Sequence, residues 1–451
     1  MTHDGNSNAS MTFSNIRSAN CNATIQATSG FFSAQGLASA SGVPQIINGS
    51  VLPGSFMFSA ESPDGTVYHY GLFYRRRGVY DVVSQASNAS VLGMSISAGL
   101  FLNSNASNLN WSTTFFPSVS IAPTLTLGPG VVTTLAGSGS PAFADGTGTN
   151  ASFSSPSGVA ILPNGNIVVA DNNRIRLVTP AGVVTTLAGS GSGAFADGTG
   201  TNASFSSPSG VAILPNGDIV VADTNNYRIR LVTPAGVVTT LAGTGSIGSL
   251  DGTGTNARFN FPRGITALPN GDIVVADSNN HRIRLVTLAG VVTTLAGSTA
   301  GFADGTGTNA KFSNPSGLTL LPSGDIAVAD NGNNRIRLVT LAGVVTTLAG
   351  STAGFADGTG TNARFSTPRG VASLANGSVV VADRDNHRIR LVTSAGVVTT
   401  LAGSTSGFAD GTGTNASFSS PNGVATDPYR DLVVVADSAN NRIRQLTLAY
   451  S

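Results

Sequence analysis

The sequence lacks several residue types on which chemistry at a protein site often depends. Cys21 is the only cysteine among 451 residues, Glu61 is the only glutamate and Lys311 is the only lysine. A single cysteine excludes an internal disulfide and a thiolate metal cluster. Charged residues make up only 10% of the chain, and the formal net charge is +1. This balance gives no reason to expect a nucleic acid or an acidic membrane surface as a partner.

Long apolar runs are missing as well. No run reaches the ~18 residues that a membrane helix needs, so we expect no membrane insertion. The first ten residues, MTHDGNSNAS, have neither the basic nor the apolar part of a secretory leader. We therefore expect either a route without such a leader or a numbering that begins after processing. The abundance of Ser, Thr, Asn and Gly favours an extracellular or surface-associated setting, and the oligomeric state stays open.

The sequence is rich in repetition. The string DGTGTNA starts at residues 145, 197, 251, 304, 357 and 410, a period of 52 to 54 residues. Each period holds four short β-rich segments, which in the second copy read SGVAILP, GDIVVAD, YRIRLVT and GVVTTLAG. The PNGD string between the first two is a strong hairpin signal. Four antiparallel strands repeated radially are typical of a β-propeller blade, with a solenoid as the main alternative.

The order of these segments predicts how the ring closes. The first GVVTTLAG, residues 130–137, precedes any partner, and the last three segments, within 421–448, have no fourth strand after them. We therefore predict an all-β, six-bladed propeller in which residues 130–137 pair with the last blade. Such pairing removes the open edges of the ring.

Residues 1–127 do not match the repeat and hold most of the aromatic residues, including Trp111. Alternation of apolar and polar residues predicts strands within 66–83 and 94–102. We expect a separate all-β domain, of the sandwich type, ahead of a propeller formed by residues 128–451. The YRRRG string at 74–78 is either a contact loop of that domain or a solvated turn.

Three strings carry a resemblance to a known family: Pro-x-Gly-Val-Ala, Gly-Asp-Ile-Val-Val-Ala-Asp and Asn-Asn-His-Arg-Ile-Arg. Together they resemble the NHL repeat, and the connector from TTLAG to DGTGTNA resembles the variant of bacterial and plant NHL proteins. The resemblance implies a propeller that serves mostly as a recognition or scaffold surface, with a minority of enzymes and some RNA-binding members. Fold alone does not decide between these roles.

The Asp-Gly-Thr-Gly loop invites comparison with a metal site. A Ca²⁺ loop needs six to eight oxygen ligands, and each copy offers one carboxylate. We therefore expect no metal and no cofactor here. Instead, we expect the Asp to cap the turn, the glycines to take positive φ, and a phenylalanine such as Phe205 to anchor the loop between blades.

The Arg-Ile-Arg strings predict an internal charge lattice. By the two-residue period of a strand, Arg228 and Arg230 lie on one face and Ile229 on the other. Each copy sets these two arginines against the Asp of VAD and the Asp of DGTG. Because the arginines have acidic partners, we do not expect a nucleic-acid surface.

The copies differ at the variable positions of NA-x-F and P-x-G and in the loop before Arg-Ile-Arg. Copies one, two and six are neutral there, with the residues Ser152, Ser157, Ser204, Ser209, Ser417 and Asn422. Copies three to five are basic, with the residues Arg258, Arg263, His281, Lys311, Arg364, Arg369, Arg384 and His387. We predict that this basic sector lies on one face of the ring and binds a negatively charged protein or glycan. Drift among solvated loop positions is the alternative.

Catalysis would need convergent reactive groups. Six-bladed lactonases and amidating lyases gather carboxylates, amides or histidines at the central channel, often around a metal. Among the innermost segments here, only Asp427 carries a charge, and no activated serine or acid/base glutamate is evident. We predict no catalytic residues and a recognition or scaffold role. The alternatives are a purely structural surface or virion-type component, and a lactonase-like or lyase-like propeller enzyme.

Overall fold

The computed structural model describes the backbone of eight strands within residues 1–126, and residues 127–427 and 430–450. The chain divides into two compact units, Met1–Thr126 and Leu127–Ser451. Each is treated separately below.

The first unit contains two antiparallel sheets. One sheet has the order β1-β2-β3-β4-β5 and the other β6-β7-β8. The bounds are β1 (Thr2–His3), β2 (Ala9–Ile16), β3 (Cys21–Thr28), β4 (Phe31–Ala38), β5 (Gln45–Ser50), β6 (Ser55–Glu61), β7 (Val67–Arg75) and β8 (Val79–Ala86). The strands expected within 66–83 are confirmed as β7 and β8. The expected strand at 94–102, Trp111 and most of the YRRRG loop lie outside the described residues, and the sandwich stays a prediction.

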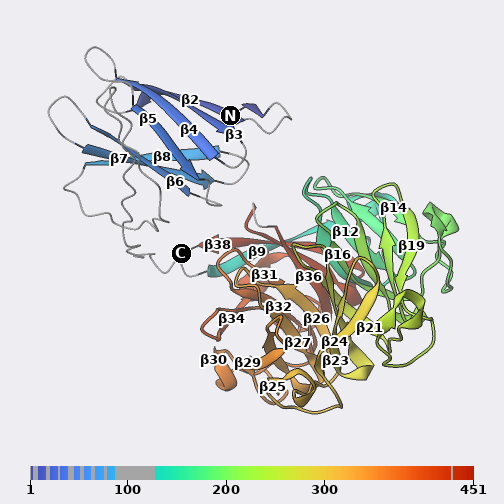
Figure 1. Cartoon of the computed structure of the whole chain (residues 1–451). Coiled ribbons are helices and arrows are strands. Elements are labelled where there is room, and N and C mark those ends of the chain that lie inside the picture. Colours follow the sequence, from blue (N-terminus) through green and yellow to red (C-terminus); the bar gives the residue numbers. More distant parts are fainter. Residues whose placement is uncertain are drawn as a thin grey trace. The chain divides into compact units, whose positions relative to one another are not determined.

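The second unit is a six-bladed β-propeller, as predicted (Figure 1). The innermost strands are β11 (Pro156–Ile161), β16 (Pro208–Ile213), β21 (Pro262–Ala267), β26 (Pro315–Leu320), β31 (Pro368–Ser373) and β36 (Pro421–Asp427). Each contacts the innermost strand of the next blade, and β36 contacts β11 to complete the ring. The second strands are β12 (Ile167–Asp171), β17 (Ile219–Asp223), β22 (Ile273–Asp277), β27 (Ile326–Asp330), β32 (Val379–Asp383) and β37 (Leu432–Asp437).

The outer half of each blade carries the Arg-Ile-Arg strand and the Val-Val-Thr-Thr strand. The third strands are β13 (Arg174–Val178), β18 (Arg228–Val232), β23 (Arg282–Val286), β28 (Arg335–Val339), β33 (Arg388–Val392) and β38 (Arg442–Tyr450). The fourth strands are β14 (Val183–Ala188), β19 (Val237–Ala242), β24 (Val291–Gly297), β29 (Val344–Gly350), β34 (Val397–Ala402) and β9 (Leu127–Ala136).

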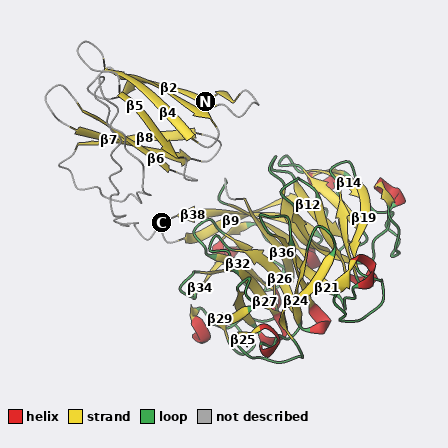
Figure 2. Cartoon of the chain, viewed as in Figure 1, coloured by secondary structure: helices red, strands yellow, loops and turns green. Residues whose placement is uncertain are grey.

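A fifth strand of two residues, which the sequence did not predict, pairs with the fourth strand in every blade. These strands are β10 (Gly146–Thr147), β15 (Gly198–Thr199), β20 (Gly252–Thr253), β25 (Gly305–Thr306), β30 (Gly358–Thr359) and β35 (Gly411–Thr412). Short 3₁₀ turns follow them: η1 (Gly148–Asn150), η2 (Gly200–Asn202), η4 (Gly254–Asn256), η6 (Gly307–Asn309), η8 (Gly360–Asn362) and η10 (Gly413–Asn415). Others follow the second strand: η3 (Thr224–Asn226), η5 (Ser278–Asn280), η7 (Asn331–Asn333), η9 (Arg384–Asn386) and η11 (Ser438–Asn440). The rest of the unit is strand and loop (Figure 2).

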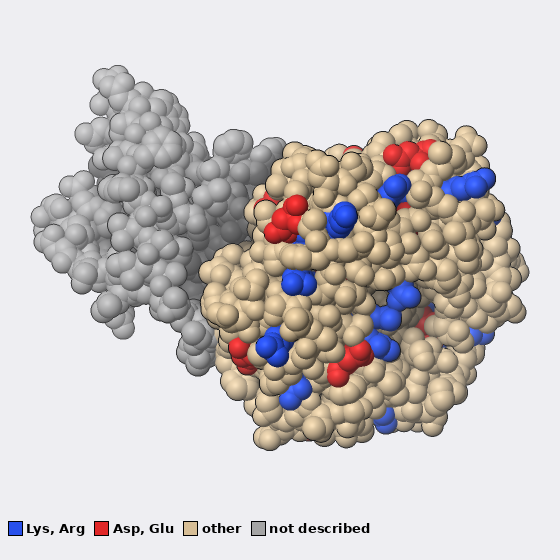
Figure 3. Space-filling view, turned by 90° about the horizontal axis from the view of Figure 1, so that it is seen from below, with Lys and Arg blue, Asp and Glu red and all other residues tan. Residues whose placement is uncertain are grey.

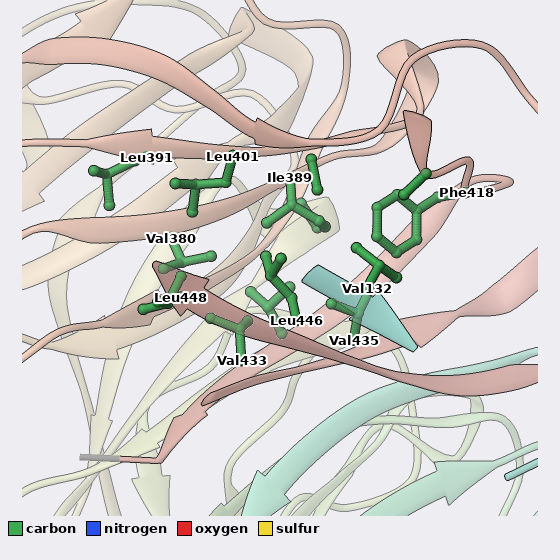
Figure 4. Packing of buried hydrophobic residues seen from close by; sticks show 14 of the residues in the cluster. Val132, Val380, Ile389, Leu391, Leu401, Phe418, Val433, Val435, Leu446 and Leu448 are labelled. Carbon is green, nitrogen blue, oxygen red and sulfur yellow. The ribbon is translucent and has the colours of Figure 1, made fainter. Parts of the chain in front are cut away.

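The ring closes as the segment order predicted. Strand β9 pairs antiparallel with β38, with Val132 opposite Leu446, and lies beside it in Figure 1. Val132 is 1% exposed and packs in a cluster with Val435, Leu446 and Phe418 (Figure 4). The first and last strands of the propeller therefore share one hydrophobic core, which removes two open sheet edges.

Six glycines fix how closely the innermost strands approach one another. They are Gly158, Gly210, Gly264, Gly317, Gly370 and Gly423, each two residues after the proline that begins the strand. A Cβ atom at any of them would lie 1.8 to 2.3 Å from a backbone carbonyl oxygen of the next blade. Such separations are far inside van der Waals contact. Glycine is therefore required here for close approach between blades.

The Asp-Gly-Thr-Gly segment is structural, but it works differently from the predicted turn cap. The Oδ1 atom of Asp197 lies 2.6 Å from Nη2 of Arg230 and accepts a bond from the Thr240 hydroxyl on the fourth strand. As predicted, Gly200 takes a positive φ of 57°, and Phe205 is fully buried between the first and second blades. The segment thus ties the entry of a blade to the outer strands of that blade.

The predicted charge lattice is present, but the two arginines of each strand have different partners. The second one is 0% exposed and pairs with both aspartates; these residues are Arg176, Arg230, Arg284, Arg337, Arg390 and Arg444. The first one has no ion pair with an acid among the described residues: Arg228 donates to the Thr244 carbonyl at 2.9 Å and stacks on Phe195. Burial raises the pKa of Asp171 to about 6, although Arg176 and a backbone N–H act to lower it. A buried carboxylate of this kind therefore needs its arginine partner to stabilise the ionised form.

Candidate functional site at the mouth of the channel

One end of the ring carries all the connectors between blades. In the second blade, Pro208 pairs with Asp223, and Asp223 with Arg228, so the first three strands meet at this end. The fourth strand also ends here, since Ala242 pairs with Ile229. We call this end the connector face. It displays the variable positions, as the sequence analysis expected. Figure 3 shows a face with Lys and Arg side chains around the outside and beside a central hollow.

The structure separates the predicted basic sector into two groups. Arg258, Lys311 and Arg364 are exposed and lie on the connectors, beside the segment that bonds to the outer strands. We call these three residues the rim group. Arg263 and Arg369 are the second residues of the innermost strands of the third and fifth blades, at the central channel. The single signal that distinguishes the groups is the position in the repeat, NA-x-F for the rim and P-x-G for the channel.

The two predicted histidines hold neighbouring blades together. The Nδ1 atom of His281 accepts the backbone N–H of Asn314 at 3.1 Å, and Nδ1 of His387 accepts that of Ser420 at 3.1 Å. Asparagine oxygens make the equivalent bond at three other junctions: Asn173 to Ser207, Asn334 to Thr367 and Asn441 to Ser155. Burial lowers the pKa of His281. These histidines therefore have a structural contact that sequence reasoning did not foresee.

A cavity of about 340 Å³ opens at the mouth of the channel. Its walls include five of the six residues at the P-x-G position, namely Ser157, Ser209, Arg263, Arg369 and Asn422. Serine and asparagine residues that follow the connectors complete one side. The residues that appeared neutral in the sequence and the two channel arginines therefore share one cavity. We call it the mouth cavity.

The arginines at the mouth are poorly compensated. Within residues 127–427 and 430–450, no hydrogen bond or ion pair is made by the side chains of Arg263 and Arg369. Burial, followed by the positive charges of Arg263 and Arg384, lowers the pKa of Arg369 to about 10. Burial and Arg384 lower the pKa of Arg263 as well. Arg384 itself pairs with Asp385 at 2.8 Å. Two guanidinium groups without a paired carboxylate among the described residues thus line one cavity, which makes an anion favourable here.

Two serine hydroxyls of the mouth cavity already donate their protons. Ser157 Oγ donates to a backbone carbonyl, with Pro208 O at 3.0 Å. Ser209 Oγ lies 2.6 Å from Thr224 Oγ1 and 3.1 Å from the Arg263 carbonyl, while Thr224 donates to Pro262 O at 2.7 Å. Both serines therefore present lone pairs to a ligand, because a hydroxyl has one proton to give.

Phe261 is a further residue of the mouth cavity that the sequence analysis missed. Five junctions between blades use a side-chain bond to a backbone N–H, whereas this one uses the rings of Tyr227 and Phe261, 5.3 Å apart and edge to face. Phe261 has a φ of +52°, a strained conformation for a bulky side chain. The other copies carry Ser, Asn or Thr at this position. A comparison of this position between copies could have identified it.

Three other possible features, a reactive acid, a metal site and a membrane-spanning helix, have little support among the described residues. Asp427, the one acidic residue of the six innermost strands, lies 3.5 Å from Arg430 at the far end of its strand. No three His, Cys, Asp or Glu side chains of the described part lie close enough together to hold a metal ion. None of its helices is both long and apolar enough to cross a bilayer.

Comparison with known sequences identifies the repeat. The NHL repeat model matches residues 153–178, 205–230, 259–284, 312–337 and 365–390. NHL repeat-containing protein 2 of Homo sapiens is 31% identical over 326 residues, which cover 62% of this chain and 45% of that protein. Protein SUPPRESSOR OF QUENCHING 1, chloroplastic, of Arabidopsis thaliana is 32% identical over 278 residues, or 56% of this chain and 26% of that protein. The chain thus spans less than half the length of these relatives.

Solved structures share the fold. An auxiliary nutrient binding protein from Bacteroides thetaiotaomicron VPI-5482 superimposes with a TM-score of 0.56 at 16% identity, covering 93% of this chain and 94% of that one. A protein of unknown function from the same organism gives a TM-score of 0.58 at 14% identity, covering 90% and 94%. At these identities, the likeness concerns the fold alone.

Proposed function

Because the chain belongs to the NHL-repeat proteins, with matched repeats in five of its six blades, we propose that it is a non-catalytic recognition module. Its partner is negatively charged and binds at the mouth cavity. The observation that carries this proposal is that Arg263 and Arg369 both line the mouth cavity, while no hydrogen bond or ion pair holds their side chains within the described residues. An anion would take the place of the missing counter-charge.

The partial burial of Arg263 and Arg369 makes them better anion-binding groups than exposed arginines would be. Arg263 and Arg369 are half-buried, and a partly desolvated guanidinium gains more from an anion than a fully exposed one does. The rim group is solvated, so its members contribute to attraction at a distance and less to affinity. We therefore assign the contact to the mouth arginines. Lys311, Arg258 and Arg364 help to steer the partner towards them.

The state of the side chains in the cavity favours binding over catalysis. A nucleophilic serine needs a base that receives its proton. Ser157 and Ser209 donate to backbone or neighbouring oxygens instead, and Nδ1 of His281 and of His387 is occupied by a backbone N–H. The two serines therefore suit the recognition of a ligand rather than the activation of water.

The test compares two double variants of the full chain with the wild type. Arg263→Ser/Arg369→Ser, the mouth variant, installs the residue found at this position in blades one, two and four. Arg258→Ser/Arg364→Ser, the rim variant, removes the same charge and also copies a residue of other blades. The ligands are a poly-glutamate peptide, a polyuronate oligosaccharide and a phosphorylated sugar at two salt concentrations.

We expect at least one of these anions to bind the wild type in a salt-sensitive manner. The mouth variant loses that binding and the rim variant retains most of it. If none of the anions binds the wild type, or if both variants lose binding equally, the mouth cavity is not the recognition site.

A further inference from the structure

The residues that line the mouth cavity offer two complementary kinds of hydrogen-bonding group. Arg263 and Arg369 carry N–H donors alone and suit a carboxylate or phosphate. Ser157 and Ser209 have committed their protons to the protein and accept bonds from ligand O–H groups. A ligand that matches both the arginines and the serines is therefore anionic in one part and rich in hydroxyl donors in another.

The third element of the cavity is Phe261, which also lines it. Its edge-to-face contact with Tyr227 fixes the orientation of the ring. Phe261 has a left-handed backbone conformation, with a φ of +52°, which is strained for a bulky side chain, whereas the other copies carry Ser, Asn or Thr there. Phe261 and Arg263 depart from the repeat together, two residues apart, in one blade.

We propose that the mouth cavity binds an acidic sugar. Its carboxylate or phosphate pairs with Arg263 and Arg369, ring hydroxyls donate to Ser157 and Ser209, and the apolar face of the sugar ring lies on Phe261. The volume of about 340 Å³ is at the lower end of the range typical of small-ligand sites and suits one or two sugar units. This inference rests on the proposed function and specifies its ligand. An acidic peptide matches the arginines but supplies few hydroxyl donors for the serines.

The experiment is calorimetric titration of the full chain with single small ligands. The probes are glucuronate and glucose 6-phosphate as acidic sugars, glucose as the neutral sugar, acetate and inorganic phosphate as simple anions, and a Glu-Glu dipeptide. Two variants accompany the wild type, namely the mouth variant and Phe261→Ser, which installs the residue of three other blades. Thermal unfolding of each variant shows that the fold is retained.

We expect an acidic sugar to bind at least about tenfold more tightly than glucose, its matching simple anion and the dipeptide, since only the acidic sugar combines charge-assisted hydrogen bonds to the arginines with hydroxyl donors for the serines. The difference between glucuronate and glucose 6-phosphate identifies which acid group the cavity prefers. The mouth variant loses the advantage over glucose, and Phe261→Ser loses the advantage over the simple anion.

Three results would overturn the inference. If simple anions bind as tightly as acidic sugars, the site recognises charge alone, and the proposed function stands without a sugar ligand. If the dipeptide binds most tightly, the partner is an acidic protein segment. If neither the simple anions nor the acidic sugars bind, the proposed function fails together with this inference.

Discussion

Arg230 and Asp223 face each other across strands β18 and β17, with Nη1 and Oδ2 2.6 Å apart and both side chains 0% exposed. Asp223 also accepts bonds from the Ser206 backbone N–H and from the amide of Asn226. The same pairing recurs in all six blades. The connector face is therefore built on a fixed frame of buried charges, and its variable residues project from that frame.

Loss of a buried carboxylate from this frame should be costly. In Asp223→Ala, Arg230 keeps its charge in the interior with one partner fewer. We expect the free energy of unfolding to fall by about 3–5 kcal/mol, as is usual when one member of a buried pair is removed. Denaturant unfolding measures the change. Asp197→Ala is the matched control, because it removes the partly exposed partner of the same arginine, and its effect should be smaller. Equal effects would show that burial does not set the cost.

Closure of the ring can be tested on a single strand. Val132 of β9 is 1% exposed, and its neighbour Val131 is 44% exposed. Val132→Asp places an unpaired carboxylate in the core shared with the last blade, and we expect a loss of about 3–5 kcal/mol in the free energy of unfolding. Val131→Asp on the same strand should change stability by less than about 0.5 kcal/mol. A mild effect of Val132→Asp would contradict closure through β9.

The glycine contacts predict sensitivity to a single methyl group. In Gly210→Ala, the new Cβ would lie 2.2 Å from the Arg263 carbonyl oxygen, and overpacking of this kind costs about 1–3 kcal/mol. Gly193→Ala is the control, since its Cβ would have no neighbour closer than 3.6 Å and its φ is not positive. Thermal unfolding of both variants measures the difference. If Gly210→Ala unfolds like the wild type, the innermost strands are more widely spaced than the structure shows.

His281 should make stability depend on pH. Burial lowers its pKa below the ordinary value of about 6.5, so the folded state binds fewer protons than the unfolded state between the two values. The contribution is fully present above about pH 6.5 and is lost as the pH falls further. Protonation of Nδ1 would also remove the bond from Asn314.

His281→Asn installs the residue that the fourth and sixth blades carry at this position, as Asn334 and Asn441. The variant should show a weaker dependence of stability on pH, without loss of stability near pH 7. Unfolding free energies of both proteins between pH 7 and 5 give the comparison. Because the aspartates are common to both, the difference between the two curves isolates the histidine. Parallel curves would show that His281 does not titrate with folding.

The sequence predicted the ring, the number of blades and the closing strand because each follows from counting and ordering repeated segments. It also predicted the acid–base frame, since both aspartates and both arginines recur in every copy. It did not predict that Arg230 pairs with both aspartates while Arg228 bonds to a backbone carbonyl, nor did it predict the short fifth strand. Those depend on which side chain faces the core and where a connector passes, and the strand pattern is the same for both arginines.

For the site, the sequence placed the basic residues on one face but could not give their distance from the central axis. Arg263 lies at the channel and Arg258 on the rim, although the two are only five positions apart along the chain. The structural contact of His281 was also hidden, because Asn and His share it through different atoms. Phe261 was not predicted, because it lies just before the proline of P-x-G, outside the positions at which the copies were seen to differ in charge.

The most direct measurement is the affinity of the mouth and rim variants for the best anionic ligand, at two salt concentrations. Both variants lose two positive charges, so any long-range effect of charge is the same. The mouth cavity predicts at least about a tenfold loss of affinity for Arg263→Ser/Arg369→Ser, as expected when charge-assisted hydrogen bonds are removed, and little loss for Arg258→Ser/Arg364→Ser. An equal loss in both variants would mean that the protein attracts anions over its whole connector face, which would contradict a defined site.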